Sequence, residues 1–131
     1  MDTHTPSRDA IQVLAEAYCD AVHFARADVF ADMCHDKFSM TEVSADGSAQ
    51  FWDKSAYLTR VSGRGAFEGA PDYEIFSIDV AGDEMARVHL RVDVPPNRYE
   101  DHLGFIRVDG TWKLMTKVFR TMGGSDREGR A

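Results

Sequence analysis

The segment RYEDHLGFIRVDGTWKLMTKVFR, residues 98–120, constrains the fold most strongly, because two alternating runs flank an Asp-Gly dipeptide. A two-residue type I′ turn needs positive φ at both central positions, and Asp-Gly between apolar runs is typical of such a turn. The segment therefore predicts two antiparallel strands, residues 98–108 and 111–120. The register set by this turn places Asp101 opposite Val118.

The same register separates the hairpin into two faces. One face is apolar apart from Asp101 and includes Leu103 and Trp112. The other face mixes charge with apolar bulk, and its members are Glu100, His102, Gly104, Ile106, Lys113, Met115, Lys117 and Phe119. We expect the first face to lie on the core and the second to lie on the outside of a sheet.

The strand preceding this hairpin, residues 85–94, has an apolar residue at every second position. Pairing Val94 with Tyr99 across the turn PPNR brings its apolar face onto the face of Trp112. The agreement of the apolar faces supports this register.

A further strand is expected at residues 73–80, and its register depends on the turn AGDE. A two-residue loop would turn Ile75 and Ser77 toward the core, whereas a three-residue loop would turn Phe76 and Ile78 toward it. The apolar count favours the three-residue loop.

The N-terminal half has the periodicity of helices. Apolar residues recur at three- and four-residue steps over residues 8–26, with Ser7 as the expected N-cap. The remaining expected elements are a short helix capped by Asp28, a strand at 37–44 with Phe38 and Met40 on one side, and a helix at 53–63 capped by Asp53. A curved antiparallel sheet with one apolar face needs a cover, which these helices supply. The expected fold is α+β and cone-shaped, with the helix at 8–26 on the concave face of the sheet.

Length and composition limit the classes of protein. The 131 residues predict a single domain, residues 1–131, with flexible tails at 1–6 and 121–131. A net charge of −7 with dispersed acids argues against nucleic-acid binding, and no run approaches the ~20 apolar residues of a membrane span. The first ten residues lack a leader pattern, so we expect a cytoplasmic location.

Cysteine and histidine spacing is also informative. Cys19 and Cys34 have no Cys-x-x-Cys spacing and are expected to be free packing residues. The five histidines show no metal-ligand spacing, and no nucleotide-binding or nucleophile-elbow motif is present. We therefore expect neither a metal nor a cofactor.

The order of helices followed by a meander, the sequence CHDKF at residues 34–38 and the ending YEDHLGFIRVDGTWKLMTKVF resemble a known family. They are similar to the lumazine-binding or polyketide-cyclase-like branch of the nuclear transport factor two-like (NTF2-like) superfamily, over residues 8–120. The pattern departs at His102, where an aromatic residue is usual. The resemblance implies the cone-shaped fold. It does not select an activity, because the superfamily holds isomerases, dehydratases, hydrolases, cyclases and binding modules, and the branch name does not make lumazine the expected ligand.

Asp101 is the principal candidate for catalysis. An acid on an apolar concave face is desolvated, which raises its pKa and suits it to acid/base chemistry. The alternatives are structural: an ion pair with Arg120, or a carboxylate that is hydrogen-bonded at the end of the sheet. His35, near the expected mouth of the cone, either shares a proton with Asp101 or caps the end of the second helix.

Seven apolar and aromatic residues are candidates to line a pocket for a small apolar or aromatic ligand. They are Tyr18, Met40, Trp52, Tyr57, Leu90, Leu103 and Trp112. For any single one of them packing in a filled core is the favoured interpretation, so the group carries more weight than its members.

The outer face offers two further interpretations. Arg91, His102 and Lys117, with His89, form either an anion site or a solvated or interface patch, and the absence of a Gly-rich loop favours the patch. The apolar residues among them predict a homodimer formed through the outer face of the sheet. Two functions remain open: a small-molecule-binding protein with acid/base chemistry, or a non-catalytic binding or assembly module.

Overall fold

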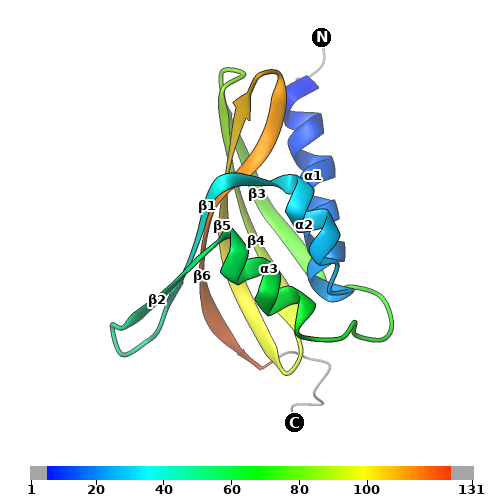
Figure 1. The fold of residues 1–131 in the computed structure, drawn as a ribbon, viewed down its shortest axis with the longest axis vertical. Helices are drawn as coiled ribbons and strands as arrows, with labels where there is room; N and C mark the ends of the chain where they lie inside the picture. The colour runs from blue at the N-terminus through cyan, green and yellow to red at the C-terminus, as the bar shows by residue number, and fades with distance from the viewer. Residues whose placement is uncertain (1–5, 125–131) are drawn as a thin grey trace.

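The computed structural model describes residues 6–124, which form three helices and six strands (Figure 1). The helices are α1 (Pro6–His23), α2 (Ala27–Met33) and α3 (Lys54–Ser62). The strands are β1 (Cys34–Val43), β2 (Ala49–Asp53), β3 (Tyr73–Ala81), β4 (Met85–Val94), β5 (Asn97–Val108) and β6 (Thr111–Gly124). The order of helices followed by a four-strand meander agrees with the sequence prediction.

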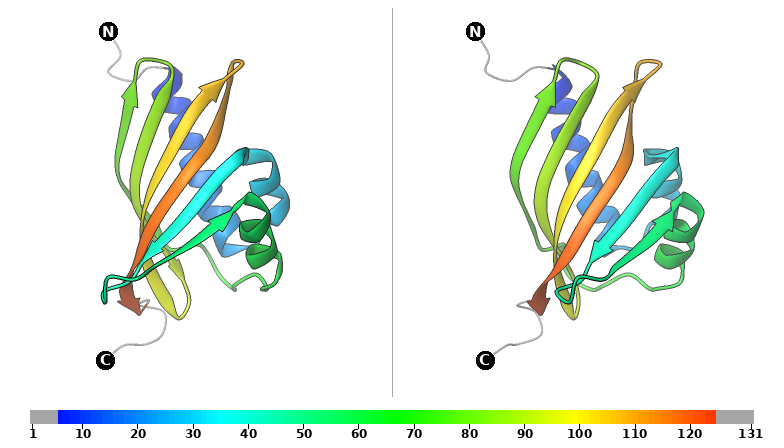
Figure 2. Two further views of the ribbon diagram at one scale, coloured as in Figure 1. Left: turned by 60° about the vertical axis from the view of Figure 1, so that its left-hand side comes forward. Right: turned by 90° about the vertical axis from the view of Figure 1, so that its left-hand side faces the viewer.

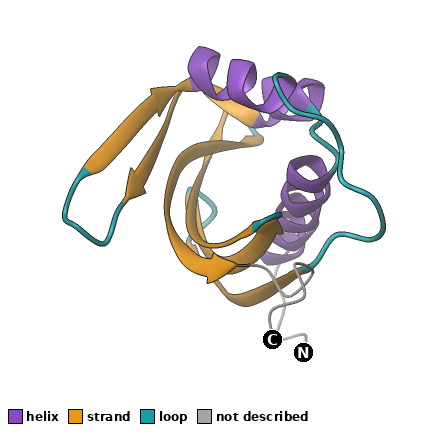
Figure 3. Ribbon diagram, turned by 90° about the horizontal axis from the view of Figure 1, so that it is seen from below, coloured by secondary structure: helices purple, strands orange, loops and turns teal. Residues whose placement is uncertain are grey.

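All six strands belong to one sheet in the order β2-β1-β6-β5-β4-β3. Neighbouring strands are antiparallel, except that β1 and β6 run parallel. The sheet is strongly curved, and α1 lies along its concave side (Figures 2 and 3). This α+β arrangement confirms the predicted fold.

The helices divide the cover of the sheet between them. The α1 helix packs on β3 and β4, whereas α2 and α3 pack together near β1. On α1, the core face repeats at three- and four-residue steps and is fully buried at Ile11, Ala15, Tyr18, Cys19 and Val22. Cys19 and Cys34 are both buried and free, as predicted.

Of the three predicted caps, one is confirmed. The Asp53 side chain accepts a hydrogen bond from the Ala56 backbone N–H at 2.8 Å and caps α3. Asp28 lies in the first turn of α2 and not at its cap. Ser7 lies inside α1, and its hydroxyl donates to Asp83 Oδ1 at 2.7 Å, which ties the helix to the β3–β4 turn.

The β4–β5 register differs from the prediction by two residues. Val94 pairs with Asn97 instead of Tyr99, because the turn uses only Pro95 and Pro96. A shift of two residues preserves the face of every side chain, since the period of a strand is two. The predicted faces of β4 are therefore correct although the predicted partners are wrong.

The β3–β4 turn has the predicted three-residue loop and buries Ile78. A bulge between Ile75 and Ser77 then changes the alternation of β3. As a result Phe76 lies outside, 43% exposed, and the prediction that it faces the core is wrong.

The most consequential difference is a bulge in the β5–β6 hairpin. Phe105 pairs with Leu114 as predicted, but Gly104 pairs with Thr116, so Met115 is an extra residue on β6. The pairs beyond it shift by one residue, and such a shift turns every side chain to the opposite face. Gly104 suits this position, because a Cβ there would lie 2.4 Å from Thr116 Oγ1.

Lys117 and Phe119 consequently lie on the concave face, where the sequence predicted neither. Lys117 pairs with Leu103, and Phe119 pairs with Asp101. Both side chains are buried. The bulge therefore places a cation on the same concave face as Asp101.

Some predictions concern the ends of the chain. Pro6 and residues 121–124, expected in the tails, lie in α1 and β6. The remaining tail residues, 1–5 and 125–131, lie outside the described residues. Within residues 6–124, no helix is long and apolar enough to cross a membrane.

Candidate functional site

The Asp101 carboxyl is the buried polar centre of the concave face. It has no exposed surface, and its Oδ2 accepts a short hydrogen bond from the Tyr18 hydroxyl. The predicted alternative partner, Arg120, instead donates to Glu100 Oε1 at 2.9 Å. The ion pair between Asp101 and Arg120 is therefore not formed.

Lys117 lies beside this carboxyl on the neighbouring strand. Asp101 and Lys117 are diagonal neighbours on one face, which long side chains can bridge. The Lys117 Nζ lies 5.2 Å from the ring centre of Tyr18, 5.1 Å from that of Tyr57 and 4.9 Å from that of Phe119. Three aromatic faces thus surround the amine.

A cavity of about 100 Å³ adjoins Lys117. Its lining includes Arg60 and Arg64 from the end of α3 and the segment after it, together with Met40, Tyr99 and Phe119. The lining contains three cationic side chains and no acidic one. Arg60 is exposed, Arg64 is half-buried and Lys117 is buried, so positive charge extends from the surface into the interior.

Three buried polar atoms in this region have no hydrogen-bond partner among the described residues. They are the Tyr57 hydroxyl, Arg64 Nη1 and Asp101 Oδ1. Native proteins pair most buried polar atoms, and unpaired ones often mark a position that a ligand or water completes. Arg64 lines the cavity, and Tyr57 and Asp101 lie near Lys117, which also lines it.

Burial shifts the titration of this cluster toward the neutral forms. It raises the pKa of the Asp101 carboxyl, as predicted, with Lys117 and Tyr18 opposing the shift. It lowers the pKa of the Lys117 amine, which Asp101 opposes and which Arg60 and Arg64 reinforce. Burial also raises the pKa of Tyr18 and of Tyr57 well above the ordinary value.

Four other hollows formed by the described residues are larger than the cavity beside Lys117. Their volumes are about 610 Å³ between α2 and α3, about 430 Å³ on the outer face, about 260 Å³ beside α1 and α2, and about 170 Å³ near Val118. Lys117 lines none of these four hollows. Within residues 6–124, no group of three metal-ligating side chains is present.

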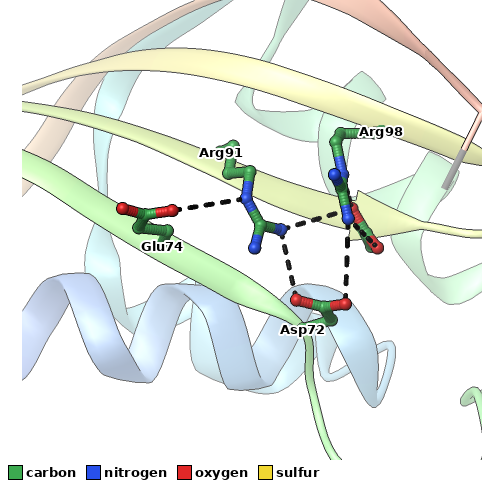
Figure 4. A network of polar contacts seen from close by, with 5 residues as sticks. Asp72, Glu74, Arg91 and Arg98 are labelled. Carbon is green, nitrogen blue, oxygen red and sulfur yellow. Dashed lines mark hydrogen bonds and ion pairs between the residues drawn. The ribbon is translucent and has the colours of Figure 1, made fainter. Parts of the chain in front are cut away.

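Around Arg91, charged side chains form an ion-pair network with Asp72, Glu74 and Arg98 (Figure 4). Arg91 lies 3.2 Å from Asp72, 3.8 Å from Glu74 and 3.7 Å from Asp93. Arg98 Nε donates to Asp93 Oδ1 at 2.7 Å. Acids already surround Arg91 and Lys117 lies on the other face, so the predicted anion-site alternative is wrong.

Comparison with known proteins decides the family. A family model described as "Putative lumazine-binding" matches residues 6–120. The chain belongs to this family. Among curated proteins, no sequence matches it.

Solved structures similar to this family member share the NTF2-like fold. An NTF-2 like protein of unknown function from Silicibacter pomeroyi DSS-3 is 24% identical, with a TM-score of 0.76 over 90% of this chain and 99% of that chain. An NTF2-like protein of unknown function from Shewanella baltica OS155 is 16% identical, with a TM-score of 0.82 over 95% and 100%. A ketosteroid isomerase-like protein from Erwinia carotovora atroseptica SCRI1043 is 14% identical, with a TM-score of 0.72 over 92% and 99%.

In this family member, several predicted ligand residues surround the cluster formed by Asp101, Lys117 and Tyr18. The Tyr18 hydroxyl donates a hydrogen bond to Asp101, the Tyr57 ring faces the Lys117 amine, and Met40 lines the cavity. Trp52 lies at the side of the cluster, its ring centre 6.3 Å from that of Phe119 and 4.7 Å from Arg60 Cζ. Leu90 and Leu103 are fully buried on the concave face near Asp101.

Two predicted residues lie elsewhere. Trp112 packs on the core opposite Arg107, close to the Asp-Gly turn, and does not line the cavity. His35 Nδ1 accepts a hydrogen bond from the Lys37 backbone N–H at 3.0 Å. In the described part of the chain, no hydrogen bond or ion pair joins His35 to Asp101.

The sequence analysis did not identify the three cations of the cavity. Arg60 and Arg64 are four residues apart, and their position at the end of the predicted helix 53–63 was the available signal. Lys117 was assigned to the outer face because nothing in the alternation of β6 reveals the bulge at Met115. Phe119 was misplaced for the same reason.

Proposed function

We propose that this chain binds a small organic molecule that carries a negatively charged group, in the cavity beside Lys117. The observation that carries this proposal is the set of three cations, Arg60, Arg64 and Lys117, around a lining without an acid. Arg64 and Lys117 are partly desolvated and the cavity lining offers them no acid, which favours an anion there. A guanidinium also matches a carboxylate geometrically through two parallel hydrogen bonds.

The other residues that line the cavity indicate the chemical character and the size of the rest of the ligand. Met40, Tyr99 and Phe119 supply apolar and aromatic surface, which suits an apolar or aromatic body. The cavity of about 100 Å³ is smaller than the ~300–1,000 Å³ of sites for drug-sized molecules. We therefore expect a short ligand with one anionic end.

Titration calorimetry with benzoate and with uncharged benzamide tests this proposal. Benzoate should bind the wild type, and benzamide should bind at least ~10-fold more weakly, because a charged hydrogen bond contributes about 1.5–3 kcal/mol. Arg64→Gln should weaken benzoate binding by a similar factor. Arg87→Gln, whose partner Asp79 lies on the surface, is the matched control and should bind normally. Equal affinity for the acid and the amide would contradict the proposal.

Acid/base catalysis is a second candidate function. It is favoured by the Asp101 carboxyl, which has a raised pKa, a Tyr18 donor on one oxygen and no partner on the other. A substrate would have to reach a carboxyl that has no exposed surface. Turnover of a bound ligand that Asp101→Asn abolishes, with binding retained, would support this role.

The outer face supports a homodimer, the alternative expected for an assembly module. Exposed apolar side chains lie there, including Phe76, which is 43% exposed, and Val118, which is 45% exposed. Met85, Ile106 and Met115 line the hollow of about 430 Å³ on the same face and extend this apolar surface. Apolar surface of this kind is typical of an interface, and a two-fold dimer would cover it.

A further inference from the structure

Lys117 differs from two other lysines of this chain in its bonding. Lys54 Nζ donates to the Cys34 carbonyl at 3.0 Å, and Lys113 Nζ donates to the Asp32 carbonyl at 2.6 Å. Within residues 6–124, no hydrogen bond or ion pair holds Lys117 Nζ, and three aromatic rings lie around it. An ammonium group has three donors to satisfy, so this buried site suits a neutral amine better than the surface does.

The groups that face Lys117 come from several elements. They are Tyr18 on α1, Tyr57 and Arg60 on α3, Arg64 after α3, Cys34 on β1 and Asp101 on β5. Burial and the two arginines lower the pKa of the amine, and Asp101 opposes them. A lysine that is desolvated and close to other cations is a known type of amine nucleophile.

Lys117 also has access to a ligand. It keeps 8% of its surface exposed and forms part of the wall of the cavity. Arg60 and Arg64 lie in the same wall, where they can hold a carboxylate while another part of the ligand meets the amine.

We propose that Lys117 forms an imine with the carbonyl group of a small oxo acid whose carboxylate is held by Arg60 and Arg64. This inference rests on the proposed function and specifies the ligand class of the same cavity. An oxo acid is the simplest molecule that presents an anion to the arginines and an electrophilic carbon to the amine.

The step balances without an oxidant or a reductant. The Lys117 ammonium first releases a proton, for which the unpaired Oδ1 of Asp101 is the nearby acceptor. The amine nitrogen forms a bond to the carbonyl carbon, and the carbonyl oxygen takes up the proton that Asp101 accepted. The nitrogen then passes a second proton to this oxygen, the carbon–oxygen bond breaks, and the oxygen leaves as water. The products are a protonated imine and one water molecule, from one ammonium and one carbonyl.

The surroundings also stabilise the product. The imine nitrogen keeps a positive charge, and the rings of Tyr18, Tyr57 and Phe119 lie within the distance at which an aromatic face attracts a cation. The Asp101 and Tyr18 pair supplies the negative and proton-donating groups beside it. The site can therefore hold the adduct as well as form it.

Reductive trapping tests this inference on the full-length wild type. The protein is incubated with pyruvate and sodium cyanoborohydride near neutral pH, and peptide mapping by mass spectrometry locates the adducts. We expect one dominant adduct at Lys117, formed about tenfold or more faster than at Lys54 or Lys113, because the two arginines would hold the oxo acid beside this amine. Trapping spread evenly over the four lysines, or absent from Lys117, would overturn it.

Variants and a second ligand separate this inference from the proposed function. Lys117→Arg should lose the dominant adduct, whereas Lys113→Arg, the matched surface control, should keep it; a thermal melt checks that both are folded. Lactate keeps the carboxylate but lacks the carbonyl, so its binding reports on the anion site alone. Lactate binding without a pyruvate adduct at Lys117 would overturn the imine and leave the proposed function intact. Failure of pyruvate and lactate to bind while benzoate binds would overturn the imine alone, and failure of all three would overturn both.

Discussion

The Tyr18 and Tyr57 hydroxyls give opposite predictions, although both are buried on the same cluster. Tyr18 donates to Asp101, so Tyr18→Phe leaves a buried carboxylate without its donor and should lower the free energy of unfolding by about 1–3 kcal/mol. The Tyr57 hydroxyl has no partner, so Tyr57→Phe should be neutral or stabilising. Urea unfolding measures both, and equal effects of the two substitutions would contradict the assigned bonding.

The charge of Lys117 should govern the pH dependence of stability. The folded Asp101 carboxyl has a raised pKa, so its contribution is fully present below the unfolded value of about 3.9 and is lost as pH rises through the folded value. The positive charge of Lys117 is the main influence that limits this rise of the Asp101 pKa. In Lys117→Met the pKa of Asp101 should rise further, and stability should fall more steeply between about pH 4 and pH 8 than in the wild type.

Lys113→Met is the matched control for this experiment, because the Lys113 side chain bonds a backbone carbonyl on the surface. Its unfolding free energy should run parallel to that of the wild type as pH changes. Parallel curves for Lys117→Met as well would show that Asp101 and Lys117 are not coupled.

The sequence predicted the environment of Asp101 but not its partners. The alternation of β5 is enough to place Asp101 on the apolar face, and burial then raises its pKa. Tyr18 lies 83 positions away in the chain, so the pairing of the two depends on how α1 crosses the sheet. No local pattern contains that information.

The α3 helix is capped by one residue and carries another that lines the cavity, so the cap is expected to affect binding. Asp53 caps this helix, which carries Tyr57 and Arg60. Asp53→Ala should lower the free energy of unfolding by about 0.5–2 kcal/mol and weaken benzoate binding, because the first turn frays. Asp36→Ala, at an exposed carboxylate with a 3.5 Å ion pair, should stay within about 0.5 kcal/mol of the wild type. A cap variant with full stability would contradict the role of Asp53.

Strand β6 shows where element-level prediction ends. The Asp-Gly turn fixes the first pairs of the hairpin, and these are correct as far as Leu114. The bulge at Met115 reverses the faces after it, and both registers leave a plausible mixture of apolar and charged residues. Gly104 was the one local signal, because a glycine inside a strand often marks a bulge or a close approach.

For the whole molecule, the outer face predicts self-association. Sedimentation should show that the wild type is a dimer. We expect the interface to bury ~1,600 Å², the standard size for a stable complex. Val118→Glu should give a monomer, because it places a charge among exposed apolar side chains. Val13→Glu, on α1 and 63% exposed, is the control and should leave the dimer intact. A monomeric wild type at high concentration would contradict the proposal.

The fold of the whole chain was predictable from the sequence because strand periodicity, turn residues and helical periodicity agree along its length. The cavity was not predictable, since its volume depends on how closely the side chains of α1, α3 and β6 fill the cone. The expected pocket under Trp112 is absent from the described cavities, whereas the cavity beside Lys117 lies at the opposite end of the hairpin.

The central claim, a buried amine that faces an anion-binding cavity, is tested most directly by NMR of the four lysine side chains. The account predicts that the ε-methylene signals of Lys117 alone are shifted by the three aromatic rings, titrate below the ordinary pKa of about 10.4 and move when benzoate is added. Four lysines that titrate together near that value, with no signal that responds to benzoate, would contradict it.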